Sequence, residues 1–412
     1  MTTLQEPSAA NGTRMPVIES PFLRAPEPAK SIFVIMIAAA CLPLLGGWLL
    51  FGWRAVVVTF LSLAGCVVFE KLYYRIAQLP VPPGESHSYL TGILLAMTLP
   101  AFVPWYVPLT AAAFAILVGK AFFGGVGHFL WQPALVGRLA VAVMFPSVLM
   151  LDAKLPDYAP VLAQNKLVIG DVRAAQRPSE YRQWEGTAAP GEADALLLRR
   201  PDKILSELGH LQEPPYSALL FASPDMPHAA PAALKQLPPL TDFLLGARGG
   251  GIGETCSVAI LLAGLYLIYR NYVKWQLPIS FLLGASAVAL LGPIMLNGPN
   301  DTTDVVMWPL INQLIAKEGL DVGLVYLSYQ LLSGELLLAA FFLATEMTSR
   351  PVTGSGQALF GALCGLIGMG LRMYLDTPIP FYMAVLAMNT FTPLIDTLWR
   401  PRVLGQRYWF LK

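Results

Sequence analysis

Gly249-Gly250-Gly251-Ile252-Gly253-Glu254 leads through Thr255-Cys256-Ser257 into the apolar stretch Val258 to Tyr269. This order places a nearly bare backbone and a carboxylate at the start of a predicted membrane helix. Glycine reaches positive φ and leaves amide groups uncovered, and a helix N-terminus carries partial positive charge. Because a carboxylate near lipid is costly and usually has a role, the stretch predicts a membrane protein that handles a charged species.

The composition of the whole chain indicates the same class of protein. Hydrophobic residues make up 55% and charged residues 13% of the 412 residues, and the mean hydropathy is +0.57. A soluble domain usually has about 25% charged residues. The formal net charge of +1 argues against nucleic acid as a partner, because proteins that bind it usually carry a basic stripe.

Cysteine spacing and short motifs predict no redox or nucleotide chemistry in this chain. Cys41, Cys66, Cys256 and Cys364 stand singly in apolar stretches, so they are expected to be small core residues and not a metal site or a disulfide framework. No dinucleotide fingerprint is present, and the glycines before Glu254 lack the strand and lysine of a P-loop. We therefore predict no catalytic residue and no bound metal.

Ten apolar runs have a length at or near that of a membrane span. They cover residues 31–51, 54–72, 89–100, 105–123, 132–150, 255–270, 277–296, 322–345, 355–375 and 381–398. Two runs are irregular: the third is short and ends at Pro100, and the fifth begins at Gln132-Pro133 and contains Arg138. Broken helices are tolerated only where protein or a water-filled cavity satisfies the backbone. The predicted fold class is therefore an all-α integral membrane protein with about ten transmembrane helices.

Lysines and arginines in the short loops predict the topology. They are concentrated on one side, so the positive-inside rule places both termini in the cytoplasm of a multi-pass protein of the cytoplasmic (inner) membrane. Five segments on each side of a long polar region make the two halves run in opposite senses, as in an inverted repeat. The predicted parts are a cytoplasmic tail (1–30), a first five-helix repeat (31–150), a non-cytoplasmic polar loop region (151–248), a second five-helix repeat (249–398) and a cytoplasmic tail (399–412).

A weak internal similarity agrees with such a repeat. Gly92-Ile93-Leu94-Leu95-Ala96-Met97-Thr98 compares with Ala340-Phe341-Phe342-Leu343-Ala344-Thr345-Glu346, and prolines follow both. Corresponding interrupted segments of inverted halves usually meet near the bilayer midplane and form an ion or substrate site. The alternative, that all apolar segments rich in small residues look alike, stays open.

Few polar residues lie inside or at the edge of the predicted spans, and each is a candidate because burying a charge is costly. They are Glu70, Lys120, His128, Gln132, Arg138, Glu254, Glu335, Glu346, Arg372, Asn389 and Asp396. For Lys120 and Arg372 we expect snorkelling at a helix end. Glu70 with the adjacent Lys71 also fits a plain interfacial pair. His128 is interpreted as an interfacial histidine, with a proton relay as the alternative.

Four motifs in order resemble a known family. Phe123-Gly124-Gly125-Val126-Gly127-His128-Phe129-Leu130-Trp131-Gln132-Pro133-Ala134-Leu135-Val136-Gly137-Arg138 is similar to Phe-Gly-Gly-x-Gly-x-Asn-x-x-Asn-Pro-Ala-x-x-Gly-Arg in the RnfD/NqrB family, the homologous membrane subunits of the Rnf complex and of the sodium-pumping NADH:quinone reductase (Nqr). Gly251-Ile252-Gly253-Glu254 resembles their Gly-Ser-Ile-Gly-Glu, and Ala344-Thr345-Glu346-Met347-Thr348-Ser349 resembles Ala-Thr-Asp-Pro-Val-Ser. Asn389 with Pro393-Leu394-Ile395-Asp396 resembles the closing Asn-x-x-x-Pro-Leu-x-Asp.

The resemblance implies a fold, a set of partners and an ion path. It implies ten helices in two inverted five-helix repeats, assembly with the other subunits of an Rnf- or Nqr-like complex, and coupling of electron flow through flavins to Na⁺ or H⁺ movement. The acidic residues at matching positions, and hence the implied ion path, are Glu70, Glu254, Glu346 and Asp396. Glu346 replaces the family's aspartate, which keeps the charge and lengthens the side chain.

The residues depart from the family where FMN would be attached. Family members carry FMN as a phosphoester on the threonine of Ser-Gly-Ala-Thr, which is absent here. In the nearest counterpart, Asp194-Ala195-Leu196-Leu197-Leu198-Arg199-Arg200-Pro201, Arg200 stands in place of that threonine, and Thr187 is the nearby hydroxyl candidate. Arginine cannot form the ester, so covalent FMN is expected to be lost. Arg199 and Arg200 still provide charge that suits a phosphate.

A second departure concerns the expected contacts to a riboflavin ring. The Asn-x-x-Asn of the Nqr relatives reads Phe129 and Gln132 here. Gln132 keeps a hydrogen-bond donor and an acceptor, whereas Phe129 keeps neither. FMN or riboflavin is therefore implied by the resemblance alone, with Gln132 as the retained contact.

Three functions are consistent with these observations. The first is a membrane subunit of an Rnf- or Nqr-type electron-transfer complex, in which other subunits carry the redox centres that accept electrons. The second is a transporter or channel-like protein on the same scaffold without the redox role. The third is a structural subunit that uses region 151–248 as a docking surface.

Overall fold

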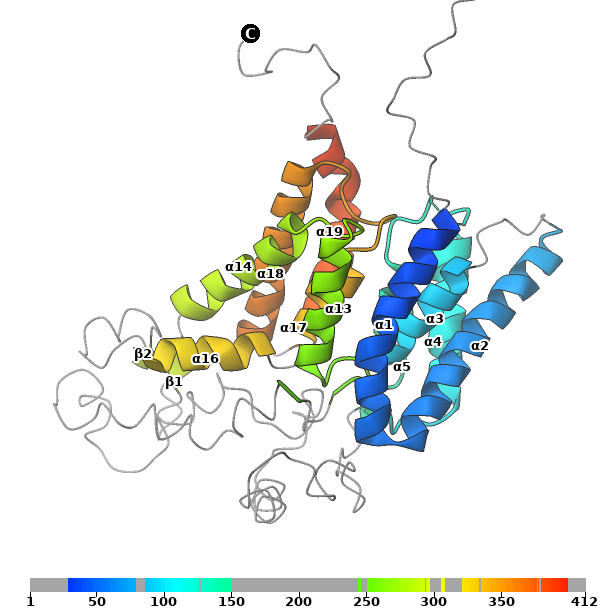
Figure 1. Ribbon diagram of the computed structural model, residues 1–412, viewed down its shortest axis with the longest axis horizontal. Coiled ribbons are helices and arrows are strands. Elements are labelled where there is room, and N and C mark those ends of the chain that lie inside the picture. The colour runs from blue at the N-terminus through cyan, green and yellow to red at the C-terminus, as the bar shows by residue number, and fades with distance from the viewer. Residues whose placement is uncertain are drawn as a thin grey trace, which may run out of the picture.

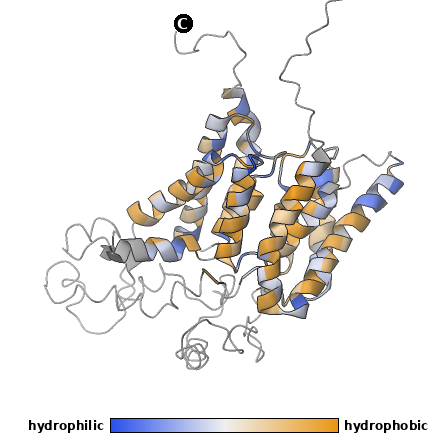
Figure 2. Cartoon of the chain, in the orientation of Figure 1, coloured by the Kyte–Doolittle hydropathy of each residue, from blue (hydrophilic) through white to orange (hydrophobic). Residues whose placement is uncertain are grey.

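A computed structural model shows a mostly helical chain (Figure 1). It describes residues 29–78, 86–149 without 126, 244–245, 250–292, 294–296, 305–307, 321–332, and 335–398 without 376 and 378. These helices are apolar along most of their length, with hydrophilic residues gathered toward some helix ends, as at the end of α2 (Figure 2). This is the pattern of an α-helical membrane protein.

The first set of helices precedes residue 150. It comprises α1 (Ala29–Phe51), α2 (Trp53–Ile76), α3 (Ser86–Thr98), α4 (Tyr106–Ile116), the π-helical turn η1 (Leu117–Ala121), α5 (Pro133–Met144) and α6 (Pro146–Leu149). Gly52, at φ 68°, makes the sharp turn between α1 and α2. Pro133 starts α5 at a position where a missing N–H costs nothing. The expected short third segment is confirmed, and α3 ends two residues before Pro100.

The second set begins after the glycine-rich segment. It comprises α13 (Ser257–Tyr269), α14 (Gln276–Leu291), α16 (Asp321–Leu332), α17 (Leu336–Leu338), the π-helical turn η5 (Ala339–Leu343), α18 (Gly354–Tyr374) and α19 (Pro380–Leu398). A two-stranded antiparallel sheet joins β1 (Ile294–Leu296) to β2 (Val305–Met307).

Two predicted segments have different limits. The run 277–296 was expected as one helix, but α14 ends at Leu291 and β1 follows. The run 322–345 is also not one straight helix, because its two parts are bent by 62°. At this break Glu335 points to α19, where its carboxylate accepts a hydrogen bond from the Phe381 amide. The Glu335 side chain thus accepts a hydrogen bond from an N-terminal amide of another helix, and such amides have no intrahelical partner.

Three helices in the described residues are long and apolar enough to cross a membrane: Ser31–Phe51 in α1, Trp53–Ile76 in α2 and Gly354–Tyr374 in α18. Counting the bent pair Tyr326–Leu332 and Leu336–Leu343 as one span gives a fourth. Large apolar side chains on the outer faces are exposed, such as Trp53 at 69% and Phe60 at 67%. Such faces suit lipid and not water, so the chain is a membrane protein.

The two sets lie side by side and contact each other through α1 and α13 and through α5 and α19 (Figure 1). Within the first set, α2 packs on α3 and α4, and α4 packs on α5. Within the second, α14 packs on α18, and α18 packs on α19. The buried apolar side chains of the two sets form one continuous core.

The glycine-rich segment joins the two sets through its backbone. Gly251 pairs with Pro100 in an antiparallel bridge, the Ile252 amide donates to the Leu99 carbonyl at 2.9 Å, and the Gly253 amide donates to the Met97 carbonyl at 2.8 Å. The last carbonyls of a helix lack intrahelical N–H partners, and here a distant segment supplies these donors. The expectation that these glycines leave their amides uncovered was therefore wrong, because the second half of the protein uses them to bind the first.

Close approach explains why these positions are glycine. A Cβ at Gly251 would lie 2.7 Å from the Met97 carbonyl oxygen, and one at Gly253 would lie 2.5 Å from the Met97 Cβ. Gly250 has a φ of +147°, in the range that side chains rarely adopt. The run of glycines is thus a packing requirement of the junction.

We predict that Gly253→Ala destabilises the protein by about 1–3 kcal/mol, because the added methyl group overpacks the junction. The measurement is thermal unfolding in detergent. Gly370→Ala in α18 is the matched control, since nothing lies within 4 Å of a Cβ there and alanine favours a helix more than glycine. Equal melting temperatures for Gly253→Ala and the wild type would contradict this view of the junction.

Candidate functional site

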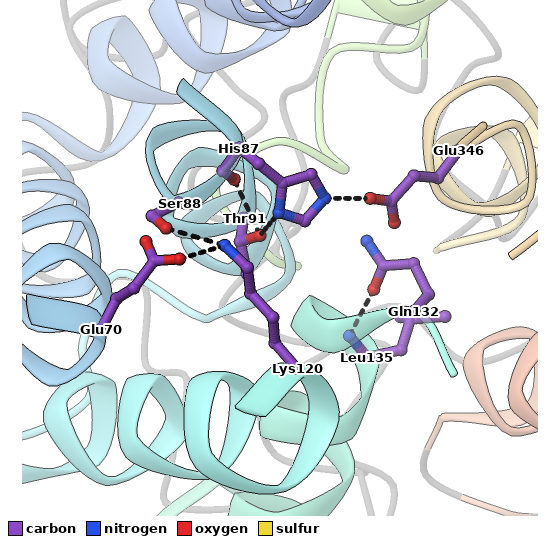
Figure 3. Close-up of polar contacts among 8 residues, drawn as sticks. All are labelled: Glu70, His87, Ser88, Thr91, Lys120, Gln132, Leu135 and Glu346. Carbon is purple, nitrogen blue, oxygen red and sulfur yellow. Dashed lines mark hydrogen bonds and ion pairs between the residues drawn. The ribbon is translucent and has the colours of Figure 1, made fainter. Parts of the chain in front are cut away.

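A buried hydrogen bond between a histidine and a glutamate at the start of α3 connects the two sets of helices. The Nε2 atom of His87 lies 2.7 Å from the Oε1 atom of Glu346, and the two side chains are 0% and 2% exposed. On the other side of the ring, Nδ1 lies 3.3 Å from the Thr91 hydroxyl, one helical turn further along α3. Figure 3 shows His87 between Thr91 and Glu346. A candidate ion-path carboxylate is thus held by a titratable base.

Aromatic rings enclose His87. The Phe33 ring of α1 meets the imidazole edge to face at 5.1 Å, and the Phe129 ring lies 5.2 Å away at a tilt of 48°. Phe129 is buried, and it occupies one of the two positions where the Nqr relatives have asparagine. A phenylalanine here gives the histidine an apolar wall and offers no hydrogen bond.

An ion pair between a lysine and a glutamate lies beside Ser88, the next residue of α3. Lys120, in the π-helical turn η1, donates to Glu70 of α2 at 2.5 Å and to the Ser88 hydroxyl at 3.0 Å, as Figure 3 shows. Both charged residues are buried. The expected snorkelling of Lys120 was therefore wrong, and so was the interfacial pair of Glu70 with Lys71, which is exposed. The Glu70 carboxylate compensates the buried ammonium group of Lys120.

The third carboxylate, Glu254, lies at the other end of α3. Its Oε2 accepts from the Gly251 amide at 2.8 Å, and its Oε1 accepts from the Tyr382 hydroxyl of α19. Nearby, Arg138 of α5 donates through Nε to the Thr98 carbonyl at 3.0 Å. The arginine adds positive charge at the C-terminus of α3, which is the favourable end for a cation. Glu254 is buried and fixes the turn that carries the junction.

Three of the four predicted ion-path residues thus lie near the short helix α3. His87 and Ser88 at its start bring in Glu346 and Glu70, and the segment around Thr98 brings in Glu254. His87 and Thr98 are eleven positions apart, which is about 16 Å along the helix at ~1.5 Å per residue. The fourth residue, Asp396, lies apart: it is half-buried and accepts from the Val352 amide at 3.0 Å.

Of the predicted cofactor contacts, Gln132 lies within the described residues. Gln132 caps α5, because its Oε1 accepts from the Leu135 amide at 2.7 Å. Its Nε2 is buried and has no partner among the described residues. Thr187, Arg199 and Arg200 lie outside the described residues.

Several buried polar atoms have no hydrogen-bond partner within the described part of the chain. They include Gln132 Nε2, Glu346 Oε2, and both amide atoms of Asn389. Two hydrogen bonds bring their segments together: Trp131 Nε1 donates to the Thr390 hydroxyl at 2.9 Å, and the Thr392 hydroxyl donates to the Ser349 carbonyl at 3.1 Å. Buried polar groups are rarely left unpaired in native proteins, so this region of α19 is suited to water or an ion.

Sequence reasoning missed His87 and Tyr382. His87 precedes the apolar run that starts at residue 89, so the apolar pattern does not include it. The available signal was a histidine within one turn of a short, interrupted membrane segment.

Arg372 was expected at the surface, but it is buried and donates to the Gln330 carbonyl at 3.3 Å. The prediction that the cysteines are core residues is confirmed for Cys66 and Cys364, which are buried, whereas Cys41 and Cys256 are half-buried.

Comparison with known proteins gives the family. A sequence profile of the NQR2, RnfD, RnfE family matches residues 16–405. The chain belongs to this family. The resemblance inferred from the four motifs is therefore confirmed along nearly the whole chain.

Individual relatives are similar over the same length. The chain is 30% identical over 393 residues to the D subunit of the ion-translocating oxidoreductase complex of Halorhodospira halophila, with 95% of each chain covered. It is 27% identical to the D subunit of the proton-translocating ferredoxin:NAD(+) oxidoreductase complex of Clostridium ljungdahlii, covering 95% of this chain and 96% of that one. It is 26% identical to the D subunit of the Na(+)-translocating ferredoxin:NAD(+) oxidoreductase complex of Acetobacterium woodii, with 96% of each covered.

We predict that Lys120→Met destabilises the protein by about 3–5 kcal/mol, because it leaves the Glu70 carboxylate buried without its cation. The double variant Glu70→Gln with Lys120→Met should recover part of this loss, since neither charge remains. Thermal unfolding of the three proteins in detergent measures the effect. Lys71→Met, at the exposed neighbouring position, is the control, and a Lys120→Met protein as stable as this control would contradict the pairing.

Proposed function

We propose that the chain is a membrane subunit of an ion-translocating electron-transfer complex of the Rnf or Nqr type, located in the cytoplasmic membrane. In this function it helps to couple redox chemistry on partner subunits to the movement of Na⁺ or H⁺. The observation that carries the proposal is the set of buried carboxylates around α3, at the junction of two helix sets, in a member of this family. The relatives' names, which include ion translocation, support the same function.

The proposed ion path uses Glu70, Glu254 and Glu346 near α3, together with Asp396. Intramembrane carboxylates are costly and typically mark ion or proton routes. Each of the three carboxylates near α3 has a hydrogen-bond partner: Lys120 for Glu70, Tyr382 for Glu254 and His87 for Glu346. Asp396 is half-buried near the end of α19, so we propose it for exchange with the aqueous phase.

The proposed architecture is ten transmembrane segments in two inverted repeats. The helix order supports it: α1 to α5 would correspond to α13, α14, α16 with α17 and η5, α18 and α19. The packing of α2 on α4 and of α4 on α5 has counterparts in α14 on α18 and α18 on α19. Each half also contains a π-helical turn, but η1 follows α4 and η5 belongs to the third segment of the second half, so these two turns are not counterparts in this correspondence.

We propose that covalent FMN is lost and that no flavin replaces it at the Phe129 and Gln132 positions. The Phe129 ring packs on His87, and the Gln132 acceptor is used to cap α5. These two side chains therefore offer a flavin ring a single polar group, the Gln132 NH₂ with its two N–H donors, which is a poor fit for the polar edge of isoalloxazine. No electron-transfer step is assigned to this chain.

The first test is purification of the chain with its native neighbours from the membrane. We expect redox subunits to copurify, and after denaturation we expect no flavin fluorescence on this polypeptide. Flavin that stays attached would overturn the proposed loss of covalent FMN. If no redox subunit copurifies, the transporter-like or the structural alternative replaces the proposed function.

The second test concerns the carboxylates. Glu346→Gln or Glu254→Gln should reduce ion movement per electron transferred to near background, because the neutral amide cannot exchange a proton or bind a cation by charge. The measurement is ion uptake by membrane vesicles that contain the assembled complex. Glu335→Gln is the matched control, since this buried carboxylate caps α19 and is not part of the proposed path. Unchanged transport in both variants would remove these residues from the path.

A further inference from the structure

A tight turn joins α13 to α14 and holds two exposed cations. Asn271, in the turn, has a φ of 61°, and the amides of Arg270 and Asn271 donate to carbonyls in the last turn of α13 at 3.0 Å and 2.9 Å. The backbone of the turn therefore caps α13. Arg270 directly follows α13, Lys274 stands two positions before the start of α14, and both are exposed. The turn thus fixes the backbone that carries both cations.

A third cation reaches the same turn from the segment before α18. Arg350 Nη2 donates to the Tyr272 carbonyl at 3.3 Å, while the Arg270 guanidinium lies 6.0 Å from the centre of the Tyr272 ring. Arg350 is half-buried, and its Nη1 atom has no hydrogen-bond partner within the described residues. Removal from water lowers the pKa of this guanidinium, because burial disfavours the charged form. Arg270, Lys274 and Arg350 together form the cationic cluster.

Two helix N-termini lie next to the cationic cluster. Gln276 begins α14 and Gly354 begins α18, and these residues are in contact, since a Cβ at Gly354 would lie 2.4 Å from the Gln276 Oε1 atom. The end of α13 lies on the side on which α14 and α18 begin (Figure 1). The start of a helix carries partial positive charge, so both helices add to the charge of the cluster.

Little negative charge offsets the cationic cluster. No member of the cluster forms an ion pair within the described part of the chain. Asp396, near the end of α19, contacts the adjoining segment, where it accepts from the Val352 amide at 3.0 Å. Its single charge does not balance three cations and two helix starts. Such an excess of positive charge at the surface attracts an anionic ligand.

Exposed apolar faces lead away from the cluster along both helices. Tyr269 is 83% exposed at the end of α13, and Trp275 is 56% exposed just before α14. Spacings of three or four residues place the exposed side chains of each helix on one face. These faces are formed by Leu262, Leu265 and Tyr269 on α13 and by Trp275, Ile279 and Leu283 on α14. Tyrosine and tryptophan are typical of the headgroup level of a bilayer, and aliphatic side chains of its interior.

We propose that the cationic cluster binds the headgroup of an anionic phospholipid on the predicted cytoplasmic side of the membrane. Arg270 and Lys274, the exposed members, contact the phosphodiester, and Arg350 contributes its charge from the inner side of the turn. The acyl chains lie along the exposed faces of α13 and α14. The site contains none of the proposed ion-path residues, so it goes beyond the proposed function and does not depend on it.

The position of the cluster favours a lipid over an acidic segment of a partner protein. The cations adjoin side chains such as Tyr269 and Leu265 that suit lipid and not water, so a ligand at the cluster also meets a hydrophobic surface. An anionic phospholipid matches both parts. Basic residues at the cytoplasmic end of membrane helices attract anionic lipids, and guanidinium groups offer paired N–H donors to phosphate oxygens.

Lipid binding to the full chain tests the proposal. Native mass spectrometry of the purified chain in detergent counts the molecules bound as phosphatidylglycerol or phosphatidylcholine is added. Both lipids have a phosphodiester, but only phosphatidylglycerol has a net negative charge. We expect it to bind more tightly, and we expect the double variant Arg270→Gln, Lys274→Gln to weaken its binding about 30-fold, as the loss of two cations near a membrane surface would. Equal affinity of the wild type for the two lipids would overturn the proposal.

The matched control removes two cations from another exposed place on the same predicted side of the membrane. It is the double variant Lys71→Gln, Arg75→Gln, whose positions are exposed near the end of α2. We expect this variant to bind phosphatidylglycerol as the wild type does. An equal loss of affinity in both double variants would contradict the proposal, because overall charge and not the cluster would then determine binding.

A measurement on the unaltered cluster covers the case in which the double variant does not fold. Phosphatidylglycerol brominated near its headgroup quenches the fluorescence of nearby tryptophans, and Trp275→Phe identifies the contribution of Trp275 among the nine tryptophans. With the full chain in phosphatidylcholine bilayers, we expect brominated phosphatidylglycerol to quench Trp275 more strongly than an equal amount of brominated phosphatidylcholine. Equal quenching by the two lipids would overturn the proposal.

Two further results would assign the cluster to a different ligand. Displacement of phosphatidylglycerol by inorganic phosphate would indicate a site for a free anion. Loss of a copurifying subunit from the Arg270→Gln, Lys274→Gln variant, with phosphatidylglycerol binding retained, would indicate a protein interface. Either result overturns the lipid site and leaves the proposed function intact.

Discussion

The backbone pairing between the end of α3 and the glycine-rich segment is the constraint on which the rest of the structure depends. A membrane helix that stops midway leaves carbonyl groups without partners, and lipid cannot supply them. Amides of Ile252 and Gly253 satisfy the Leu99 and Met97 carbonyls, and Arg138 satisfies Thr98. Because these donors come from elsewhere in the chain, α3 can be short only when both helix sets are in place.

This junction explains where the charged residues are found. An interrupted helix exposes polar backbone inside the protein, so the same region tolerates ionised side chains better than the middle of a complete helix. Each carboxylate near α3 is matched by a donor from a different element: Lys120 for Glu70, His87 for Glu346 and Tyr382 for Glu254. The contact of Glu346 joins the two helix sets, and the contact of Glu254 joins the segment before α13 to α19. Charge compensation and assembly of the fold are thus achieved by the same contacts.

The sequence predicted the helices well and the contacts between them poorly. Apolar length and proline positions located α1, α2, α18 and the short α3, because these features act locally. The break before α17 depends on a bond between Glu335 and the start of α19, which no local pattern reveals. Family motifs identified Glu254 and Glu346, but their partners could not be predicted. The burial of Lys120 depends on Glu70, fifty residues away, and residues of that kind look like surface lysines until the fold is known.

The two π-helical turns set the direction in which the site's charges point. A π-helical turn accommodates one residue more than an α-helical turn, and such turns are frequent at functional sites. Lys120 lies within η1, and η5 ends three residues before Glu346. Removing the extra residue would rotate the next part of the chain by about 100°, the angle per residue of an α-helix with ~3.6 residues per turn. In each half, the alignment of the charged side chains with their partners therefore depends on the single extra residue of the π-helical turn. Deleting one residue from that turn would separate the pairs while leaving every charged side chain in the sequence.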